Sequence, residues 1–347
     1  MSTTEIAKQL PIPAYFDASK VGEVWRVPYQ ERAILARDWA KQYSITPAAD
    51  DKTRICLLII DAQNTFCLPD FELFVAGNSG KGAIEDNIRL CEFIYRNLGV
   101  ISTIAPTMDT HTAMQIFHPI FWVNAAGENP APATVINLDD LKNGVWQVNP
   151  VVAYHVANND YEKLQKYAFY YVEKLSADSK YPLTIWPYHS MLGGIGHALV
   201  SAVEEAVFFH SQVRFSQTIF ELKGNNPLTE NYSVLRAEVL EDTNGQPIAQ
   251  KNANLIKQLL EFDAIIVAGQ AKSHCVAWTV DDLLTEINAK DPKLAQKVYL
   301  LADCTSPVVI PGAIDFTEQA DAAFQKFANA GMHIVKSSDA IANWLDL

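Results

Sequence analysis

The chain of 347 residues lacks the features that mark several classes of protein. Its 15 glycines and 17 prolines follow no period and form no low-complexity tract, which excludes collagen-like and solenoid architectures. No apolar stretch approaches the ~20 residues that span a bilayer. The N-terminus, MSTTEIAKQLPIP, has neither the basic start nor the apolar run of a signal peptide. We therefore expect a cytoplasmic protein with no membrane partner.

Positive charge and paired cysteines are also scarce. The chain has 27 Lys and Arg against 40 Asp and Glu, a net charge of -13, and no basic cluster stands out, so nucleic acid is not an expected partner. Five cysteines without a CxxC pair indicate reduced thiols rather than disulfides. What is present is a composition 49% hydrophobic and 10% aromatic, enough for a large core. We expect a globular enzyme with a small-molecule substrate, and the sequence leaves open whether copies form a homo-oligomer.

Short β-branched apolar segments alternate with helical patterns along most of the chain. Such near-continuous apolar strands are typical of parallel sheets that are buried on both faces. The predicted strands are 54–61, 99–109, 217–224, 263–271, 297–305 and 333–338, and the helical patterns between them are 82–97, 194–210, 248–261, 275–289 and 315–330. The alternation predicts an α/β fold with a doubly wound, mainly parallel sheet. Ligands of such sheets bind beyond the carboxyl ends of the strands.

Two regions fall outside this alternation. Residues 1–53 form an N-terminal extension with one predicted helix, 29–43, and no strand. Residues 119–185 include the aromatic stretch YAFYY and are too long for a bare connection in a compact domain. We expect one main domain over 54–345, with 119–185 as an insertion that covers the functional site.

Three reactive side chains stand at predicted strand ends. Asp61 ends the first strand in LLIIDAQNTFC, Lys223 ends another in FELKGNN, and Cys275 follows a strand and opens a helical pattern. The macrodipole at a helix N-terminus favours thiolate, and a neighbouring carboxylate can act as general base. Each residue also has a plainer interpretation: a capping aspartate, a solvated lysine, a small buried cysteine. Together they are compatible with one catalytic site.

A second cluster consists of aspartate and histidine. Asp109 and His111 are two residues apart, on the same side of an extended segment, and His118 and His189 follow. One carboxylate with two or three imidazoles suits a divalent metal, zinc first and iron or manganese as alternatives. Histidines that merely lie near an aspartate on the surface are the plainer alternative. The remaining histidines are not grouped with other candidate ligands and are predicted to be core or surface residues: His155, His197, His210, His274 and His333.

Five motifs, taken in order, resemble one known family. They are LLIIDAQNTFCLPDFELFVAG, MDTHTAMQIFH, WPYHSMLGGIGHAL, LKGNNPLTENYS and VAGQAKSHCVAWTVDDL. Together they resemble nicotinamidases, which are isochorismatase-like cysteine hydrolases, over about 55–115 and 185–340. The resemblance implies a three-layer α/β/α fold. It also implies hydrolysis of nicotinamide to nicotinate and ammonia, with another small amide or ureido compound, or ligand binding without turnover, as alternatives.

The same resemblance assigns roles to individual residues. It implies a catalytic triad of Asp61, Lys223 and Cys275, and metal ligands at Asp109, His111 and His189, with His118 as a further ligand. It also implies an oxyanion hole from the N–H groups of Ala271 and Cys275, a cis peptide between Gln270 and Ala271, and a substrate ring held between Phe66 and Trp186.

Three features depart from the family pattern. The long insertion separates His189 from His111, whereas small family members have these elements much closer. The segment EEAVFFHSQVR offers His210 as a rival to Lys223, and we prefer Lys223 because its spacing to the following Tyr-Ser pair fits. The 53-residue N-terminal extension is also unusual for the family. The insertion concerns the substrate more than the chemistry.

Overall fold

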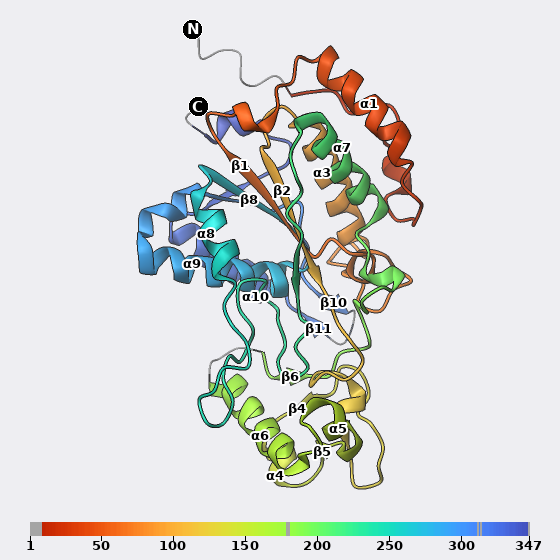
Figure 1. Ribbon diagram of the computed structural model, residues 1–347, viewed down its shortest axis with the longest axis vertical. Coiled ribbons are helices and arrows are strands. Elements are labelled where there is room, and N and C mark those ends of the chain that lie inside the picture. The colour runs from red at the N-terminus through yellow and green to blue at the C-terminus, as the bar shows by residue number, and fades with distance from the viewer. Residues whose placement is uncertain (1–8, 178–180, 311, 313, 346–347) are drawn as a thin grey trace. The chain divides into compact units, whose positions relative to one another are not determined.

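The computed structural model describes residues 9–177, 181–310, 312 and 314–345 (Figure 1). It divides into two compact units. The first unit consists of residues 1–108, 198–221 and 253–347, and the second of residues 109–197 and 222–252. Within the described part of the chain, no helix has the length and apolar character needed to cross a membrane.

A six-stranded sheet forms the centre of the first unit, and its strands β2 and β7 end in the second unit. The strand order is β12-β9-β8-β1-β2-β7, and the pairs β1–β2, β1–β8, β8–β9 and β9–β12 are parallel. The strands are β1 (Ile55–Ile60), β2 (Thr103–Asp109), β7 (Glu221–Lys223), β8 (Ala264–Gly269), β9 (Val298–Leu301) and β12 (His333–Val335). Along the chain, β2 and β7 are added on one side of β1, and β8, β9 and β12 are then added on its other side. The predicted doubly wound, parallel sheet is therefore confirmed.

Helices cover both faces of this sheet (Figure 1). One face carries α1 (Tyr29–Gln42), α3 (Gly82–Arg96) and α7 (Ser201–Arg214), and the other carries α8 (Ala253–Glu261), α9 (Ala277–Lys290) and α10 (Thr317–Asn329). Short elements complete the unit: α2 (Asn64–Cys67) and the hairpin of β10 (Val309–Ile310) and β11 (Ile314–Asp315). The result is the α/β/α layering that the resemblance implied.

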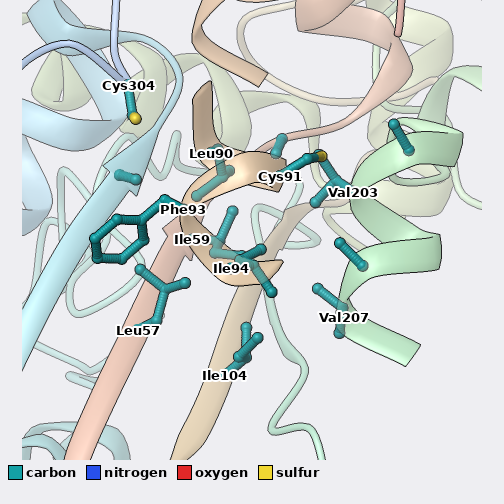
Figure 2. Packing of buried hydrophobic residues seen from close by; sticks show 14 of the residues in the cluster. Leu57, Ile59, Leu90, Cys91, Phe93, Ile94, Ile104, Val203, Val207 and Cys304 are labelled. Carbon is teal, nitrogen blue, oxygen red and sulfur yellow. The ribbon is translucent and has the colours of Figure 1, made fainter. Parts of the chain in front are cut away.

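Alternating side chains of β1 explain why helices pack on both faces. Figure 2 shows Leu57 and Ile59 against Ile94 of α3, in one cluster with Val203 and Val207 of α7. The intervening residues of β1 are also fully buried, on the opposite face of the strand. A strand buried on both faces needs an apolar residue at every position, which is what the run ICLLII supplies.

The N-terminal extension is part of the first unit. Helix α1 packs on α7, and the guanidinium Nε of Arg32 donates to Glu205 Oε1 at 2.6 Å. Arg214, which is fully buried, donates to both carboxylate oxygens of Asp51 at 2.5 Å and to the carbonyl oxygen of Thr46 at 2.6 Å. These paired charges hold the extension on the face of α7.

The second unit has a hydrophobic core of its own. The aromatic stretch of the insertion lies in α6 (Tyr161–Ala177), whose Tyr167 and Tyr171 pack with Phe117 and Trp122. Its other elements are β3 (Trp122–Val123), β4 (Val135–Ile136), α4 (Leu138–Lys142), β5 (Gln147–Val148), α5 (Ala153–Val156) and β6 (Leu183–Thr184). Residues of 222–252 complete the core. That the insertion covers the functional site stays a prediction.

One predicted helix begins later than expected. The pattern predicted a helix over 194–210, whereas α7 begins at Ser201 and is preceded by turns. Three glycines in the sequence GGIG, at 193, 194 and 196, disfavour helix here because glycine loses the most backbone freedom when it is ordered. The apolar spacing that suggested an earlier start comes from the loop.

His210 lies in the core of the first unit. Its ring is buried in α7, with Nε2 at 2.9 Å from the carbonyl oxygen of Ile101. Burial lowers the pKa of His210 to about 4. The folded protein therefore keeps this ring neutral at a pH where the unfolded chain, with a His pKa near 6.5, binds a proton.

We predict that His210 contributes to acid destabilisation of the first unit. Its folded pKa is depressed, so its contribution is complete above about pH 6.5 and is lost as the pH falls toward 4. His210→Gln keeps an N–H donor for the Ile101 carbonyl but cannot titrate. Urea unfolding at pH 7.5 and pH 4.5 should show that the variant loses less stability than the wild type, by up to about 3 kcal/mol. Equal losses in both proteins contradict the prediction.

Candidate active site

The first unit places Asp61 where the strand order reverses. Ile60 of β1 lies opposite Gly269 of β8, so Asp61 and Gln270 leave the sheet at the same end of neighbouring strands. Asp61 is fully buried, and Thr107 of β2 donates its hydroxyl hydrogen to Asp61 Oδ1. The Asp61 N–H donates back to Thr107 Oγ1 at 3.1 Å. This reversal point is where open α/β sheets bind ligands.

Glycine is required where β8 passes the end of β1. Gly269 has φ +113°, and a Cβ atom at this position would lie 2.0 Å from the carbonyl oxygen of Ile60. The next N–H, of Gln270, donates to the same oxygen at 2.8 Å. The peptide bond between Gln270 and Ala271 is cis, as the resemblance implied.

Cys275 lies in the turn that connects β8 to α9. The turn spans Lys272–Val276 and runs directly into α9, which begins at Ala277, and the Cys275 side chain is largely buried. The carbonyl of Ala271 accepts the N–H groups of His274 and Val276, whereas the Ala271 N–H has no backbone acceptor among the described residues. The predicted strand-to-helix position of the thiol is confirmed.

In the second unit, Asp109, His111 and His189 are brought together. Asp109 Oδ2 is 2.7 Å from His111 Nε2 and 3.4 Å from His189 Nε2, and one ligand atom from each residue lies within 4.8 Å of the others. Backbone hydrogen bonds fix this geometry, because the His111 N–H donates to the Ser190 carbonyl and the Leu192 N–H donates to the His111 carbonyl. The long insertion therefore does not separate the histidines.

The ring orientations fit a metal site. His111 Nδ1 contacts the Gly224 carbonyl at 2.9 Å, and His189 Nδ1 contacts the Pro187 carbonyl at 2.8 Å. A ring whose Nδ1 hydrogen is donated to a carbonyl presents the Nε2 lone pair on its other side, which is the common arrangement of metal-bound histidine. Here both Nε2 atoms face the same carboxylate oxygen. One carboxylate and two imidazoles are a donor set that suits a divalent transition metal.

His118 lies beside this cluster. Its ring centroid is 5.7 Å from that of His111 and 5.9 Å from that of His189. Its Nδ1 contacts the carbonyl of Thr112 at 3.1 Å, and among the described residues its buried Nε2 has no hydrogen-bond partner. Burial and the two neighbouring imidazoles lower the pKa of His118 to about 3, so the ring is neutral and able to bind a metal. A role as the further ligand stays a prediction.

Lys223 pairs with the same aspartate. Its Nζ donates to Asp109 Oδ1 at 2.9 Å and to the Asn231 carbonyl at 2.8 Å. Burial alone would raise the pKa of Asp109, but the charges of His111 and Lys223 hold it well below its usual range. Asp109 is therefore a carboxylate, with one oxygen facing the lysine and the other facing the imidazoles.

The sequence analysis missed two polar neighbours of the cluster. Glu230 is buried, and burial raises its pKa to about 7 although the charges of His111 and Lys223 oppose the shift. Its signal was available, because Glu230 lies in the same motif as Lys223. His197, predicted to be a core or surface residue, has its Nε2 at 2.9 Å from Thr110 Oγ1.

The two aromatic residues expected at the substrate lie in different units. Phe66, in α2 of the first unit, is buried. Trp186, in the second unit, donates its indole N–H to the Tyr232 hydroxyl at 3.2 Å. A substrate ring held between them stays a prediction.

No family model and no curated protein sequence matches the chain. Several solved structures are similar to it. The nicotinamidase–pyrazinamidase of Acinetobacter baumanii is 19% identical with a TM-score of 0.49, and the match covers 84% of this chain and 99% of that chain. The yeast nicotinamidase is 17% identical with a TM-score of 0.48, over 81% of this chain and 99% of that chain.

A further similar structure is the pyrazinamidase of Pyrococcus horikoshii in complex with zinc. It is 16% identical with a TM-score of 0.44, over 82% of this chain and 99% of that chain. These enzymes bear the same names as the family that the motifs resemble. At these TM-scores the likeness does not decide the activity, which depends on the side chains described above.

We predict that Gly224 is required for the metal-binding geometry. Gly224 has φ +87°, and a Cβ there would lie 2.7 Å from His111 Cε1 and 2.9 Å from Asp109 Oδ1. Gly224→Ala should therefore displace the ring and weaken Zn²⁺ binding by about 10- to 100-fold, as measured by calorimetric titration of the metal-depleted protein. Gly144→Ala is the matched control, because Gly144 has φ +70° but no heavy atom within 4 Å of its Cβ position. Equal affinity of the two variants contradicts this role.

Proposed function

We propose that the protein is an amidohydrolase with Cys275 as nucleophile and that it hydrolyses nicotinamide to nicotinate and ammonia. The observation that carries this proposal is the placement of Asp61 and Cys275 in the first unit. They follow neighbouring parallel strands at the point where the strand order reverses, within two of the five family motifs. A carboxylate within reach of a thiol at a helix N-terminus can act as its general base.

The chemistry then follows from the groups present. Asp61 takes the proton of the Cys275 thiol, and the thiolate attacks the amide carbon. The N–H groups of Ala271 and Cys275 stabilise the negative oxygen that develops. Asp61 gives its proton to the departing ammonia, leaving a thioester, and then takes a proton from the water that hydrolyses it. Nicotinate is released and the thiol is restored.

Lys223 completes the proposed triad on the strength of the motif. Its Nζ is buried and lies 2.9 Å from Asp109 Oδ1, so the side chain has lost most of its freedom to move. A fixed positive charge stabilises the carboxylate form of a catalytic aspartate and the negative charge of the reaction. His210 cannot take this role while its ring is held by the Ile101 carbonyl in the core.

Asp109, His111 and His189 are the residues that would hold a divalent metal, zinc before iron or manganese, with His118 as a further candidate. When bound, the metal would supply a Lewis-acidic anchor for the ring nitrogen of the substrate. Burial lowers the pKa of His189 although Asp109 opposes the shift. Burial also acts on His111, but the Asp109 carboxylate raises the pKa of that ring, so a bound metal would have to displace a proton there.

We predict that Cys275→Ala abolishes hydrolysis and leaves the fold intact. Removal of one sulfur from a largely buried site is a small change in packing, but the reaction loses its nucleophile. Ammonia release from nicotinamide should fall by at least about 10⁴-fold, with an unchanged circular dichroism spectrum.

Two control variants make this test specific. Cys56→Ala should remain active, because burial raises the pKa of Cys56 to about 12 and keeps that thiol protonated. His210→Gln should also remain active. Full turnover by Cys275→Ala, or loss of turnover in His210→Gln with Lys223→Ala active, is the result that overturns the assignment. If the wild-type protein releases no ammonia from nicotinamide, nicotinamide is not the substrate, and the alternatives are another amide or a binding function.

We also predict that metal removal raises KM more than it lowers kcat. The covalent steps belong to Cys275, so the metal site contributes mainly to binding that substrate and transition state share. His189→Ala should reproduce the effect of chelation, because His189 Nε2 faces the shared carboxylate oxygen. Kinetics before and after chelation, with metal analysis of the purified protein, provide the measurement. A metal-free enzyme with unchanged KM for nicotinamide refutes the metal site.

A further inference from the structure

A buried carboxylate outside the proposed catalytic set is bonded to the residue that precedes the oxyanion hole. Asp86 of α3 is almost fully buried, and its Oδ2 accepts the side-chain N–H of Gln270 at 2.8 Å. Gln270 is itself fully buried, and its Oε1 accepts the Ser306 N–H at 3.2 Å. Both ends of the Gln270 amide are therefore paired, one with α3 and one with the loop after β9.

Backbone hydrogen bonds hold the residues on both sides of Ala271. Before it, the Gln270 N–H donates to the Ile60 carbonyl at 2.8 Å, and after it, the Lys272 N–H donates to the Ser306 carbonyl at 2.8 Å. The backbone around Ala271 is thus attached to β1 and to Ser306, and the Gln270 side chain ties this arrangement to Asp86. The Ala271 N–H, one of the two proposed oxyanion donors, lies at its centre.

Close packing holds Asp86 in place relative to Ser306. Helix α3 begins at Gly82, where a Cβ would lie 2.6 Å from Ser306 Oγ, so only glycine allows this approach. Ser306 also donates its side-chain hydrogen bond to Asp86. Arg89 donates a hydrogen bond to Asp86 Oδ1, the oxygen that Gln270 does not contact, at 2.8 Å. Three donors thus converge on one buried carboxylate.

We propose that Asp86 is a positioning residue that acts through Gln270 to orient the Ala271 N–H toward the developing oxyanion. This inference rests on the proposed function. The hydrogen bonds make it specific: with Leu at position 86, a side chain of similar shape, the side-chain N–H of Gln270 has no acceptor there. Rotation of the Gln270 amide would only turn its NH₂ group toward the Ser306 N–H. Gln270 therefore loses its hydrogen bond to α3 in the Asp86→Leu variant, whereas an Asn side chain could still turn its oxygen toward Gln270.

The test uses a reporter of oxyanion binding besides turnover. Pyridine-3-carboxaldehyde adds to a thiol: sulfur bonds to the aldehyde carbon, the C=O π pair moves to oxygen, and the thiol proton ends on that oxygen. The adduct carries its oxygen where the amide oxygen becomes negative, so its affinity reports the oxyanion donors. The rate of Cys275 alkylation by iodoacetamide reports the thiolate alone.

For Asp86→Leu we expect kcat to fall by about 10- to 100-fold, since loss of a whole oxyanion donor costs about 10²- to 10³-fold. KM and the alkylation rate should stay near wild type, and aldehyde affinity should fall by the same factor as kcat/KM. The double variant Asp86→Asn with Gln270→Glu should recover activity, because the Asn N–H can donate to the Glu carboxylate and the Ser306 N–H keeps its acceptor. Arg89→Ala is the control, since Arg89 contacts Asp86 but not Gln270.

The outcomes separate the two proposals. A wild-type protein that binds the aldehyde at Cys275 but does not hydrolyse nicotinamide refutes the proposed substrate, and the aldehyde affinities still test Asp86. Full activity of Asp86→Leu, an alkylation rate that falls with kcat, a double variant that recovers nothing, or an equal kcat loss in Arg89→Ala each overturns the role of Asp86. Failure of Asp86→Leu to fold is distinguished by circular dichroism, and the double variant then carries the test through its aldehyde affinity.

Discussion

The pairing of β1 with β8 is the constraint on which the proposed catalytic arrangement depends. In this register the backbones of Ile60 and Gly269 approach so closely that no side chain fits between them. Strands β2 and β9 lie on opposite sides of this pair, so the chain turns away in two directions and leaves the strand ends open. Asp61 and the turn that carries Cys275 therefore leave the sheet together. Their relation is set by backbone hydrogen bonds, which are less sensitive to substitution than side-chain packing.

Buried carboxylates in this protein differ in how far nearby donors offset the effect of burial on the pKa. Burial raises the pKa of Asp86 although Ser306, Gln270 and Arg89 donate hydrogen bonds that oppose the shift. Burial also acts on Asp109, but the charges of His111 and Lys223 hold its pKa well below the usual range. Glu230 has no partner at Oε2 among the described residues, and burial raises its pKa to about 7. Because it costs several kcal/mol to take an ion out of water, paired opposite charges decide which of these carboxylates stays ionised most firmly.

Much of the fold and part of the site could be predicted from the sequence. The six main strands follow from apolar runs such as ICLLII, and the positions of Asp61 and Cys275 at strand ends follow from the strands. The Asp86–Gln270 contact could not be predicted, because it joins a helix to a loop 184 positions away and follows no local periodicity. The prediction of where α7 begins was wrong for a different reason. Apolar spacing continues through a glycine-rich loop, where the backbone cost of glycine overrides it.

The second unit explains how a long insertion between His111 and His189 is compatible with the close placement of these two side chains. Residues 119–185 pack mainly into a hydrophobic core around α6, so their length and sequence are constrained by that core. The histidine geometry is constrained elsewhere, by the hydrogen bonds that join His111 to Ser190 and Leu192 and by the carbonyls of Gly224 and Pro187 that hold the two rings. Because these bonds lie at the ends of the insertion, its interior can change without moving the Nε2 atoms. Variation in the insertion should therefore alter what surrounds Asp109, His111 and His189 before it alters their geometry.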